Sequence, residues 1–334
     1  MKMVLIDWLI ALCVVMLITW FVFTQPLFRS YSTSNFLESQ ASIADNLYQH
    51  IHKLTLKKTV NNLKRNPPIT PADYISNTIE SYGGSIQNEY FDSVGGQKRN
   101  IVLTVGPNTK DMIVIGTNYY HKTGTNQTFN ASGIAILLEL AHILLIHEQQ
   151  LENKVQLIAY PYSGEDIKNM KLSGNYLHAN KLKKLGAQVK LMIALDNFSK
   201  FSDTSGAQKF PYKFMRIFYP ENENYISVIG SLQNITKLRW FKERLVKNTK
   251  LPVYSLNMPT QFSPAKSFDH ISYQRLGFPS VLLSGMNTNR KPGNSLNTAE
   301  NYTDNQKMAQ LVISLSQVMV NSTSLKSSQF VVKN

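Results

Sequence analysis

Apolar residues along the chain fall into blocks with the lengths and spacings of strands and helices in turn. Short apolar runs predict six strands, at Asn100–Val105, Asp111–Gly116, Lys154–Tyr160, Lys190–Asp196, Tyr225–Ile229 and Ser280–Ser284. Helical spacing predicts helices at Gly133–His147, Leu172–Lys184, Asn234–Lys247 and Asn305–Val320. Because runs such as Met192–Leu195 are apolar without interruption, both faces of the sheet should be covered. The pattern predicts an α/β fold, a three-layer α/β/α sandwich around a mostly parallel sheet.

The N-terminal segment Met3–Phe23 is apolar throughout except for Asp7 and Thr19. A helix of that length rises about 30 Å, enough to cross the hydrocarbon core of a bilayer. Trp8 and Trp20 stand near its two ends, where interfacial aromatic residues are common. We therefore expect one transmembrane helix before the globular part of the chain.

A cleaved signal peptide is the alternative interpretation of this segment. The apolar run is long, and residues 25–29 carry no pattern of small residues for cleavage, so an uncleaved signal anchor is favoured. No later segment is long and apolar enough to span a membrane, which puts residues 30–334 on one side. The predicted parts are an anchor at 1–25, a helical stalk or linker at 26–69, a domain at 70–325 and a tail at 326–334.

The predicted stalk contains one amphipathic helix, Asn35–Thr55, whose apolar residues fall on one stripe. That stripe either packs on the domain or pairs with a partner helix. Basic residues follow the helix, and Pro67–Pro68 ends the segment. Thr70–Asp73 then has the capping hydroxyl, the early proline and the first-turn acid of a helix start, and Gly83–Gly84 predicts where that helix ends.

Positive charge exceeds negative charge, with 35 Lys and Arg against 21 Asp and Glu and a net charge of +14. Such an excess favours anionic partners, including lipid headgroups and polyanions, although it also serves simply to keep a surface solvated. The densest basic segment surrounds Trp240 and Phe241 and comprises Lys237, Arg239, Lys242, Arg244, Lys247 and Lys250. It is either a solvated helix with its aromatic residues turned inward or a face for an anionic partner. Cys13 is the only cysteine, so the chain forms no intramolecular disulfide and no thiolate metal cluster.

Polar and acidic residues follow three of the predicted strands. Ligands of open α/β sheets bind beyond the carboxyl ends of the strands, which places Asn118, residues 161–166 and Asp196 at one rim. At this rim Glu165, Asp166 and Asp196 are able to hold a metal ion or to act as acid and base.

A strand, a polar loop and a helix start follow one another in residues 111–133, and Asn130–Gly133 reads Asn-Ala-Ser-Gly. This stretch resembles the centre of the M28 family of zinc aminopeptidases. The same order of motifs continues over Tyr74–Val320, with short matches at Gly164–Asp166, Ser173–Tyr176, Phe268–His270 and Leu296–Asn301. The resemblance implies a zinc-exopeptidase-like fold with a mixed sheet, a location outside the cytoplasm, and a site for metal-assisted peptide hydrolysis.

The resemblance also assigns roles to two kinds of retained residue. It puts Glu165 at the position of the general base that activates a zinc-bound water. It puts Asp166 and Asp196 at positions of metal ligands.

Three other metal-ligand positions of the family are replaced. Asn118 and Asn297 stand where histidines bind zinc, and Phe129 stands where an aspartate bridges both ions. The carbonyl of an asparagine is a poor substitute for imidazole on zinc, and a benzyl group has no lone pair to offer. The resemblance therefore implies a peptidase frame without the metal chemistry.

His121, Asp269 and His270 are further candidates for the cleft. His121 is either a replacement ligand beside Asp166 and Asp196 or a polar surface residue. His270 is either a ligand or a structural histidine paired with Asp269 or with a backbone group, and the structural role is favoured.

We interpret the chain as a membrane-anchored, M28-like pseudo-peptidase that serves as a binding or scaffold component of a bacterial cell envelope and needs no cofactor. One alternative is an active metallo-aminopeptidase that holds zinc in a rearranged or single-metal site, and another is a module that chiefly contacts lipid or a polyanion. The expected partners are the membrane, through residues 3–23, an envelope protein or peptide, and an anionic lipid or polyanion, but no nucleic acid. The expected location is the inner membrane, crossed once, with the domain on the periplasmic side.

Overall fold

This computed structural model describes residues 2–26, 37–56, 70–93, 96–119, 121–123, 126–128, 130–161, 170–196, 198, 201, 206, 213–257, 269–285 and 302–320. Statements below about what is absent concern these residues alone.

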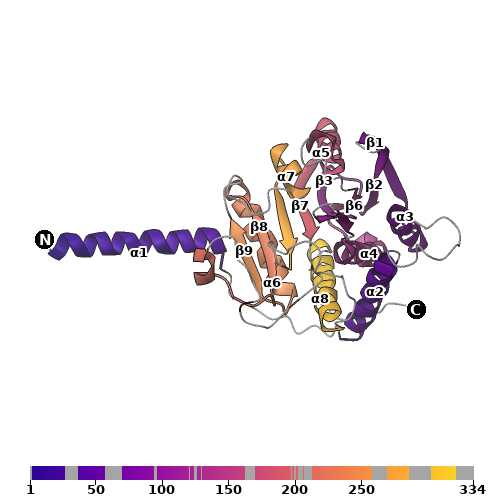
Figure 1. Cartoon of the computed structure of the whole chain (residues 1–334). Helices are drawn as coiled ribbons and strands as arrows, with labels where there is room; N and C mark the ends of the chain where they lie inside the picture. Colours follow the sequence, from indigo (N-terminus) through magenta and orange to yellow (C-terminus); the bar gives the residue numbers. More distant parts are fainter. Residues whose placement is uncertain are drawn as a thin grey trace.

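Eight strands form one mixed sheet in the order β1-β2-β6-β3-β7-β10-β8-β9, and Figure 1 shows this sheet crossing the domain. The strands are β1 (Ile86–Ser93), β2 (Gly96–Val105), β3 (Asp111–Asn118), β6 (Lys154–Tyr160), β7 (Gln188–Asp196), β8 (Ile226–Gly230), β9 (Val253–Asn257) and β10 (Ser280–Ser284). The central strands β6, β3, β7 and β10 are parallel, as are β8 and β9, while β1, β2 and β8 pair with their inner neighbours in antiparallel fashion. A separate two-stranded ribbon joins β4 (His121–Thr123) and β5 (Asn126–Thr128).

Helices cover both faces of the sheet. The helices among the described residues are α1 (Lys2–Thr24), which projects from the domain, α2 (Leu37–Leu56), α3 (Pro71–Ser81), α4 (Ala131–Ile146), α5 (Gly174–Lys184), α6 (Ile235–Asn248), α7 (Asp269–Arg275) and α8 (Tyr302–Met319), with short 3-10 turns η2 (Glu148–Gln150), η3 (Met170–Leu172), η4 (Lys213–Ile217) and η5 (Leu232–Asn234). Side chains of α2, α3, α4, α6 and α8 share one core with one face of the sheet, and those of α5 and α7 share a second core with the other face. The predicted three-layer α/β/α sandwich with a mostly parallel mixed sheet is confirmed.

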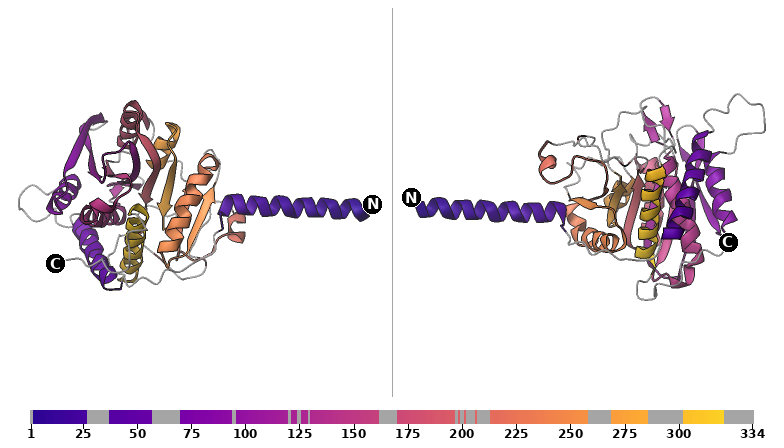
Figure 2. Two further views of the ribbon diagram at one scale, coloured as in Figure 1. Left: turned by 180° about the vertical axis from the view of Figure 1, so that it is seen from behind. Right: turned by 90° about the horizontal axis from the view of Figure 1, so that it is seen from below.

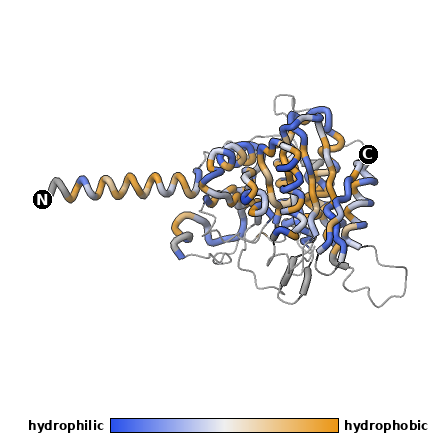
Figure 3. Tube along the Cα trace, turned by 90° about the horizontal axis from the view of Figure 1, so that it is seen from above, coloured by the Kyte–Doolittle hydropathy of each residue, from blue (hydrophilic) through white to orange (hydrophobic). Residues whose placement is uncertain are grey.

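Helix α1 stands outside this sandwich and projects from the β9 edge of the domain (Figures 1 and 2). Its segment Leu5–Thr24 is long and apolar enough to cross a membrane, and its window of greatest hydropathy has no residue buried in the domain. Figure 3 shows the same contrast, because apolar residues predominate along the projecting helix whereas those of the domain lie largely inside. One candidate membrane span is therefore present among the described residues, as the sequence predicts.

The structure adds elements that the apolar pattern does not reveal. Strands β1 and β9 lie at the two edges of the sheet, and β1 alternates between exposed and partly buried residues, so neither gives a long apolar run. Helix α7 has only seven residues, too few for a clear helical period. The predicted polar loop at 117–129 was wrong in part, because β3 continues to Asn118 and the β4–β5 ribbon follows it.

Helix α6 corrects the interpretation of the basic segment. Phe241 and Lys242 are both buried. Lys242 is therefore not part of the exposed basic face that the sequence offered as one interpretation of this segment. Trp240 is half-buried and stacks on Arg244, whose guanidinium carbon lies 4.5 Å from the ring centre. Exposed charges remain on the outer side of this helix at Lys237, Arg239, Glu243, Arg244 and Lys247.

The amphipathic helix predicted at Asn35–Thr55 is α2, which packs against α4 and α8 and buries its apolar stripe in the core. A buried polar cluster fixes this contact. His50 of α2 lies 3.1 Å from the Glu139 carboxylate of α4, and its other ring nitrogen lies 2.7 Å from the Tyr74 hydroxyl of α3. Asn46 donates to the second oxygen of Glu139 at 3.2 Å. Because His50 and Glu139 are buried, they depend on each other and on half-buried Asn46 and Tyr74 for their hydrogen bonds.

We expect Glu139→Leu to lower the free energy of unfolding by about 3 kcal/mol, because it leaves the buried His50 and Asn46 groups without their acceptor. The measurement is urea unfolding of the full chain in detergent, followed by Trp240 fluorescence. The same substitution at exposed Glu152 is the control and should change stability by less than about 0.5 kcal/mol. Equal effects of the two variants would show that the cluster does not hold α2 in place.

Candidate functional site

Three neighbouring parallel strands end together at one rim of the sheet. Asn118, Tyr160 and Asp196 are the last residues of β3, β6 and β7. Asn118 pairs with Tyr160 across β3 and β6, and Gly116 pairs with Ala194 two residues before the ends of β3 and β7. Because side chains alternate along a strand, Asn118 shares its face with Val114, which lies in the core beneath α5 and α7. The structure therefore brings the predicted residues Asn118 and Asp196 to one rim.

Asn130 ties this rim to the start of α4. Its side-chain oxygen accepts the Gly133 N–H at 3.2 Å and so caps the helix. Its amide nitrogen donates to the Thr117 hydroxyl at 2.9 Å and to the Asp196 carboxylate at 3.3 Å. One side chain thus joins β3, β7 and α4.

The rest of the Asn-Ala-Ser-Gly motif also has a packing role. The Ser132 hydroxyl accepts the backbone N–H of Phe198 at 3.2 Å. A Cβ added at Gly133 would lie 2.5 Å from the Thr117 hydroxyl oxygen, so a larger residue does not fit without a shift. The motif therefore needs no metal to account for its residues.

The two described donors at this rim do not make a zinc site by themselves. Asp196 supplies a carboxylate and Asn118 an amide, and both residues are buried. Zinc sites in proteins are built from thiolate, imidazole and carboxylate groups, usually with three or four protein ligands. No group of three His, Cys, Asp or Glu side chains able to hold a metal occurs among the described residues.

Several predicted site residues lie outside the described residues, namely Phe129, Glu165, Asp166 and Asn297. His121 lies in β4, but its side chain is outside the description as well. Their assigned roles stay predictions.

Asp269 and His270 open α7, which contacts β3 and β7. The Asn175 amide of α5 donates to Asp269 at 2.6 Å, and the Ser280 hydroxyl donates to the His270 carbonyl at 2.7 Å. Burial lowers the pKa of His270 to about 3, so its ring is neutral at physiological pH. These contacts give both residues a part in joining α7 to α5 and β10.

A second cluster, which is partly buried and which no local sequence pattern indicates, joins the edge strand β1 to α5. Glu89 of β1 lies 2.9 Å from a ring nitrogen of His178 and accepts a hydrogen bond from Lys181 at 2.8 Å. Asn100 of β2 also donates to Glu89, at 3.1 Å. Burial by itself would raise the pKa of Glu89, but the interactions with His178, Lys181 and Asn100 outweigh it and lower the pKa to about 2. Glu89 and His178 are 89 positions apart, so no local pattern indicates their contact.

Comparison with known proteins identifies a relative by sequence. No family model matches the chain. The chain is 33% identical over 278 residues to "Uncharacterized protein YfbL" of Escherichia coli K12, an alignment that covers 79% of this chain and 81% of YfbL. The chain belongs to the YfbL family.

Solved structures place the YfbL-family fold among peptidase-like folds. LapA of Legionella pneumophila superposes with a TM-score of 0.61 at 12% identity, over 88% of this chain and 79% of LapA. A Zn-dependent exopeptidase of Parabacteroides distasonis gives 0.52 at 13% identity, over 83% and 98% of the two chains. A glutaminyl cyclase of Porphyromonas gingivalis gives 0.52 at 15% identity, over 82% and 96%. At these identities the likeness shows the fold alone.

We expect Asn130→Ala to lower the free energy of unfolding by about 2–3 kcal/mol, because it removes a helix cap and leaves buried partners without hydrogen bonds. Asn130→Asp keeps the capping oxygen but sets a second carboxylate beside Asp196, so it should also destabilise. Urea unfolding at pH 7 makes the measurement. Wild-type stability in both variants would exclude the role assigned to Asn130.

We expect Glu89→Gln to lower the free energy of unfolding by about 2–3 kcal/mol at pH 7, because the folded state holds the pKa of Glu89 near 2 against an ordinary value of 4.5. A carboxyl whose pKa is lowered on folding stabilises above its unfolded pKa, and that contribution is lost as pH falls from about 4.5 toward about 2. The stability difference between the full chain and the variant should therefore more than halve between pH 7 and pH 3. A difference that stays constant over this interval would contradict the assignment.

Proposed function

We propose that the chain is a membrane-anchored, M28-like domain that has lost zinc binding and peptidase activity and serves as a binding or scaffold component of the cell envelope. The observation that carries this proposal is the donor set at the rim. Asn118 ends β3 with an amide where the M28 resemblance expects an imidazole, and Asp196 accepts a hydrogen bond from Asn130.

The chemistry of peptide hydrolysis explains why these replacements matter. A zinc ion lowers the pKa of a bound water from about 15.7 to about 7 and polarises the scissile carbonyl. An asparagine at Asn118 and, by the alignment of motifs, a phenyl ring at Phe129 weaken or remove the ligands that would hold such an ion. Glu165 at the general-base position has no comparable means of activating a water alone.

The competing function is an active metallo-aminopeptidase with a rearranged or single-metal site. It is supported by Glu165 and Asp166, which the sequence keeps, and by the Zn-dependent exopeptidase among the structural relatives. His121 is the residue that such a site would recruit, because it follows the end of β3 closely.

A binding role accords with the position of the rim and with the anchor. Enzymes of this architecture bind their ligands beyond the ends of the parallel strands, and this chain has such strand ends. The proposed occupant is a peptide or protein segment of the envelope. Helix α1 supports a single-pass location in the inner membrane, and the M28 resemblance supports a periplasmic domain. No cofactor is part of this proposal.

The test is hydrolysis of aminoacyl chromogenic substrates by the full chain in detergent, with and without added zinc. We expect no turnover above that of Glu165→Gln in either condition, because the ligand set is incomplete. Zinc-dependent turnover that Glu165→Gln abolishes would establish the metallo-aminopeptidase instead. The triple variant Asn118→His, Phe129→Asp, Asn297→His restores the expected metal ligands and is the matched control for the shape of the site. Zinc binding by this variant and not by the unmodified chain would show that only the ligands have been lost.

A further inference from the structure

The C-terminal end of α1 is built into the domain. A helix leaves its last carbonyl groups without partners inside the helix, and here the domain supplies them. Lys242 of α6 donates to the carbonyl oxygens of Thr24 and Gln25, at 2.7 Å each. Asn257 of β9 donates to the Val22 carbonyl at 2.8 Å. The Ser255 hydroxyl of β9 donates to the Thr24 carbonyl as well.

The groups around Lys242 suit a charged ammonium group. It is 3% exposed, and its third acceptor is the Ser255 hydroxyl at 3.0 Å. Three acceptors equal the three donors of a charged lysine, and the negative end of the α1 dipole favours a cation. Burial acts in the opposite direction and lowers the pKa of Lys242 to about 7.

The last turn of the span packs on the domain. Gln25 follows α1 in the left-handed region, with φ of 45°, and its N–H donates to the Phe21 carbonyl at 2.9 Å. Phe23 packs against the core beneath α5 and α7. The last turn of the span is therefore part of the packed structure of the domain.

This docking sets the depth of the domain. The apolar segment Leu5–Thr24 has 20 residues, and at about 1.5 Å per residue it matches the hydrocarbon core. Headgroup layers extend about 5–7 Å beyond that core on each side. Because the domain already contacts α1 at Val22–Gln25, the edge of the domain around α1 must lie within a headgroup layer.

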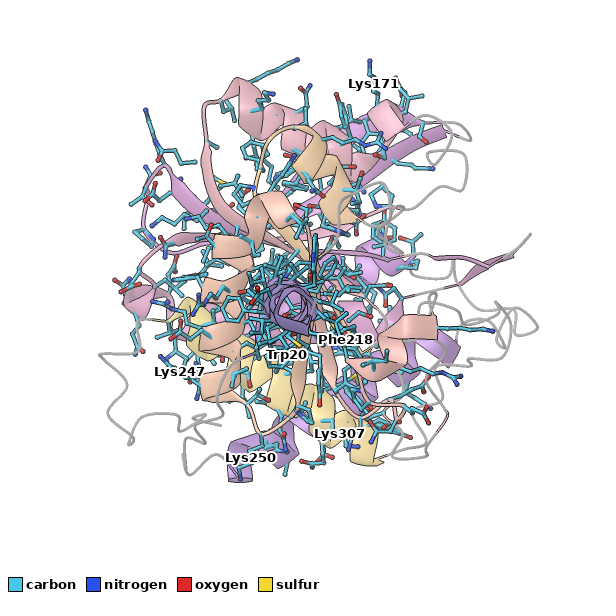
Figure 4. All side chains as sticks on the ribbon, turned by 90° about the vertical axis from the view of Figure 1, so that its left-hand side faces the viewer. Trp20, Lys171, Phe218, Lys247, Lys250 and Lys307 are labelled. Atoms are coloured by element: carbon cyan, nitrogen blue, oxygen red, sulfur yellow. The ribbon has the colours of Figure 1, made fainter. Side chains whose placement is uncertain are left out.

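The edge that surrounds α1 is rich in exposed basic side chains. Figure 1 shows the strands running across the axis of α1, so β9 and α6 extend along the membrane, and Figure 4 views this edge along α1, with Lys247 and Lys250 labelled on it. The guanidinium carbon of Arg239 lies 5.4 Å from the centre of the Phe21 ring in the span. We define the basic edge as Lys213, Arg216, Arg239, Lys247 and Lys250, all exposed.

Acidic residues do not cancel the charge of the basic edge. Glu243 pairs with Lys247 at 3.3 Å, and Glu221 is the other exposed acid on η4, α6 and the described residues between them. Ile217, the last residue of η4, is 78% exposed, and an apolar side chain at this depth would meet the boundary between headgroups and acyl chains. We propose that the basic edge binds the phosphate groups of acidic phospholipids and thereby holds the β9 edge of the domain against the membrane. The proposal rests on α1 crossing a bilayer and is independent of whether zinc binds.

The first experiment measures lipid preference with the full chain in bilayer nanodiscs. Spin-labelled phosphatidylglycerol and phosphatidylcholine are compared for association with the protein. We expect a preference of at least about fivefold for phosphatidylglycerol, the amount that one well-placed basic side chain supplies. The triple variant Arg216→Gln, Arg239→Gln, Lys247→Gln should lose it, whereas the charge-matched variant Lys171→Gln, Lys183→Gln, Lys184→Gln around α5 should keep it.

Two outcomes of this experiment would overturn the proposal. One is no preference in the unmodified chain, and the other is an equal preference in both triple variants. Soluble polyphosphate serves as a further probe in phosphatidylcholine discs. If the basic edge binds polyphosphate while the chain shows no lipid preference, this surface binds a soluble polyanion and not the membrane.

The second experiment measures depth. In a Cys13→Ser background, a fluorescent probe at Ile217→Cys should be quenched by headgroup nitroxides in phosphatidylcholine bilayers. The same probe at Tyr90→Cys is the control, because exposed Tyr90 lies on β1 at the opposite edge of the sheet. Seven strand spacings of about 4.8 Å separate the two edges, so this control should show little quenching. Equal quenching at both positions, or none at Ile217→Cys, would overturn the placement of the basic edge.

Discussion

The hydrogen bonds of the Asn130 side chain are the interaction on which the rim of the sheet depends. One amide caps α4, holds the Thr117 hydroxyl of β3 and holds the carboxylate of Asp196 at the end of β7. Because a buried polar group is costly without partners, these contacts fix the spacing between a helix start and two strand ends. The rim keeps its shape by such contacts, and a metal ion is not needed to hold it together.

These contacts hold the rim whatever chemistry it carries. In the M28 resemblance, Asn-Ala-Ser-Gly stands beside metal ligands, yet here Asn130, Ser132 and Gly133 each have a local structural role. A ligand such as the residue at Asn118 can change without disturbing those roles. Relatives with the same fold carry names as different as exopeptidase and glutaminyl cyclase, so the fold by itself does not decide the reaction.

The sequence predicts the central layers because their physical signals are local. The largely buried strand β6 and the fully buried strand β10 appear with the bounds that their apolar runs predict, and the capping pattern at Thr70 marks the start of α3. Features decided by distant contacts are not predictable in this way. Lys242 has the sequence context of an exposed lysine, and only the docking of α1 on α6 and β9 buries it. Glu89 likewise gains its partners from α5, far along the chain.

At the candidate site the sequence identifies Asn118 and Asp196 as neighbours, because adjacent parallel strands end at one rim. We propose that this rim, with Asn118, Phe129 and Asn297 at the positions where the M28 resemblance expects metal ligands, does not hold zinc. Elemental analysis of the purified full chain, after equilibration with zinc and gel filtration, tests this proposal most directly. We expect far less than one zinc ion per chain, and one or two tightly held ions per chain would contradict the proposal.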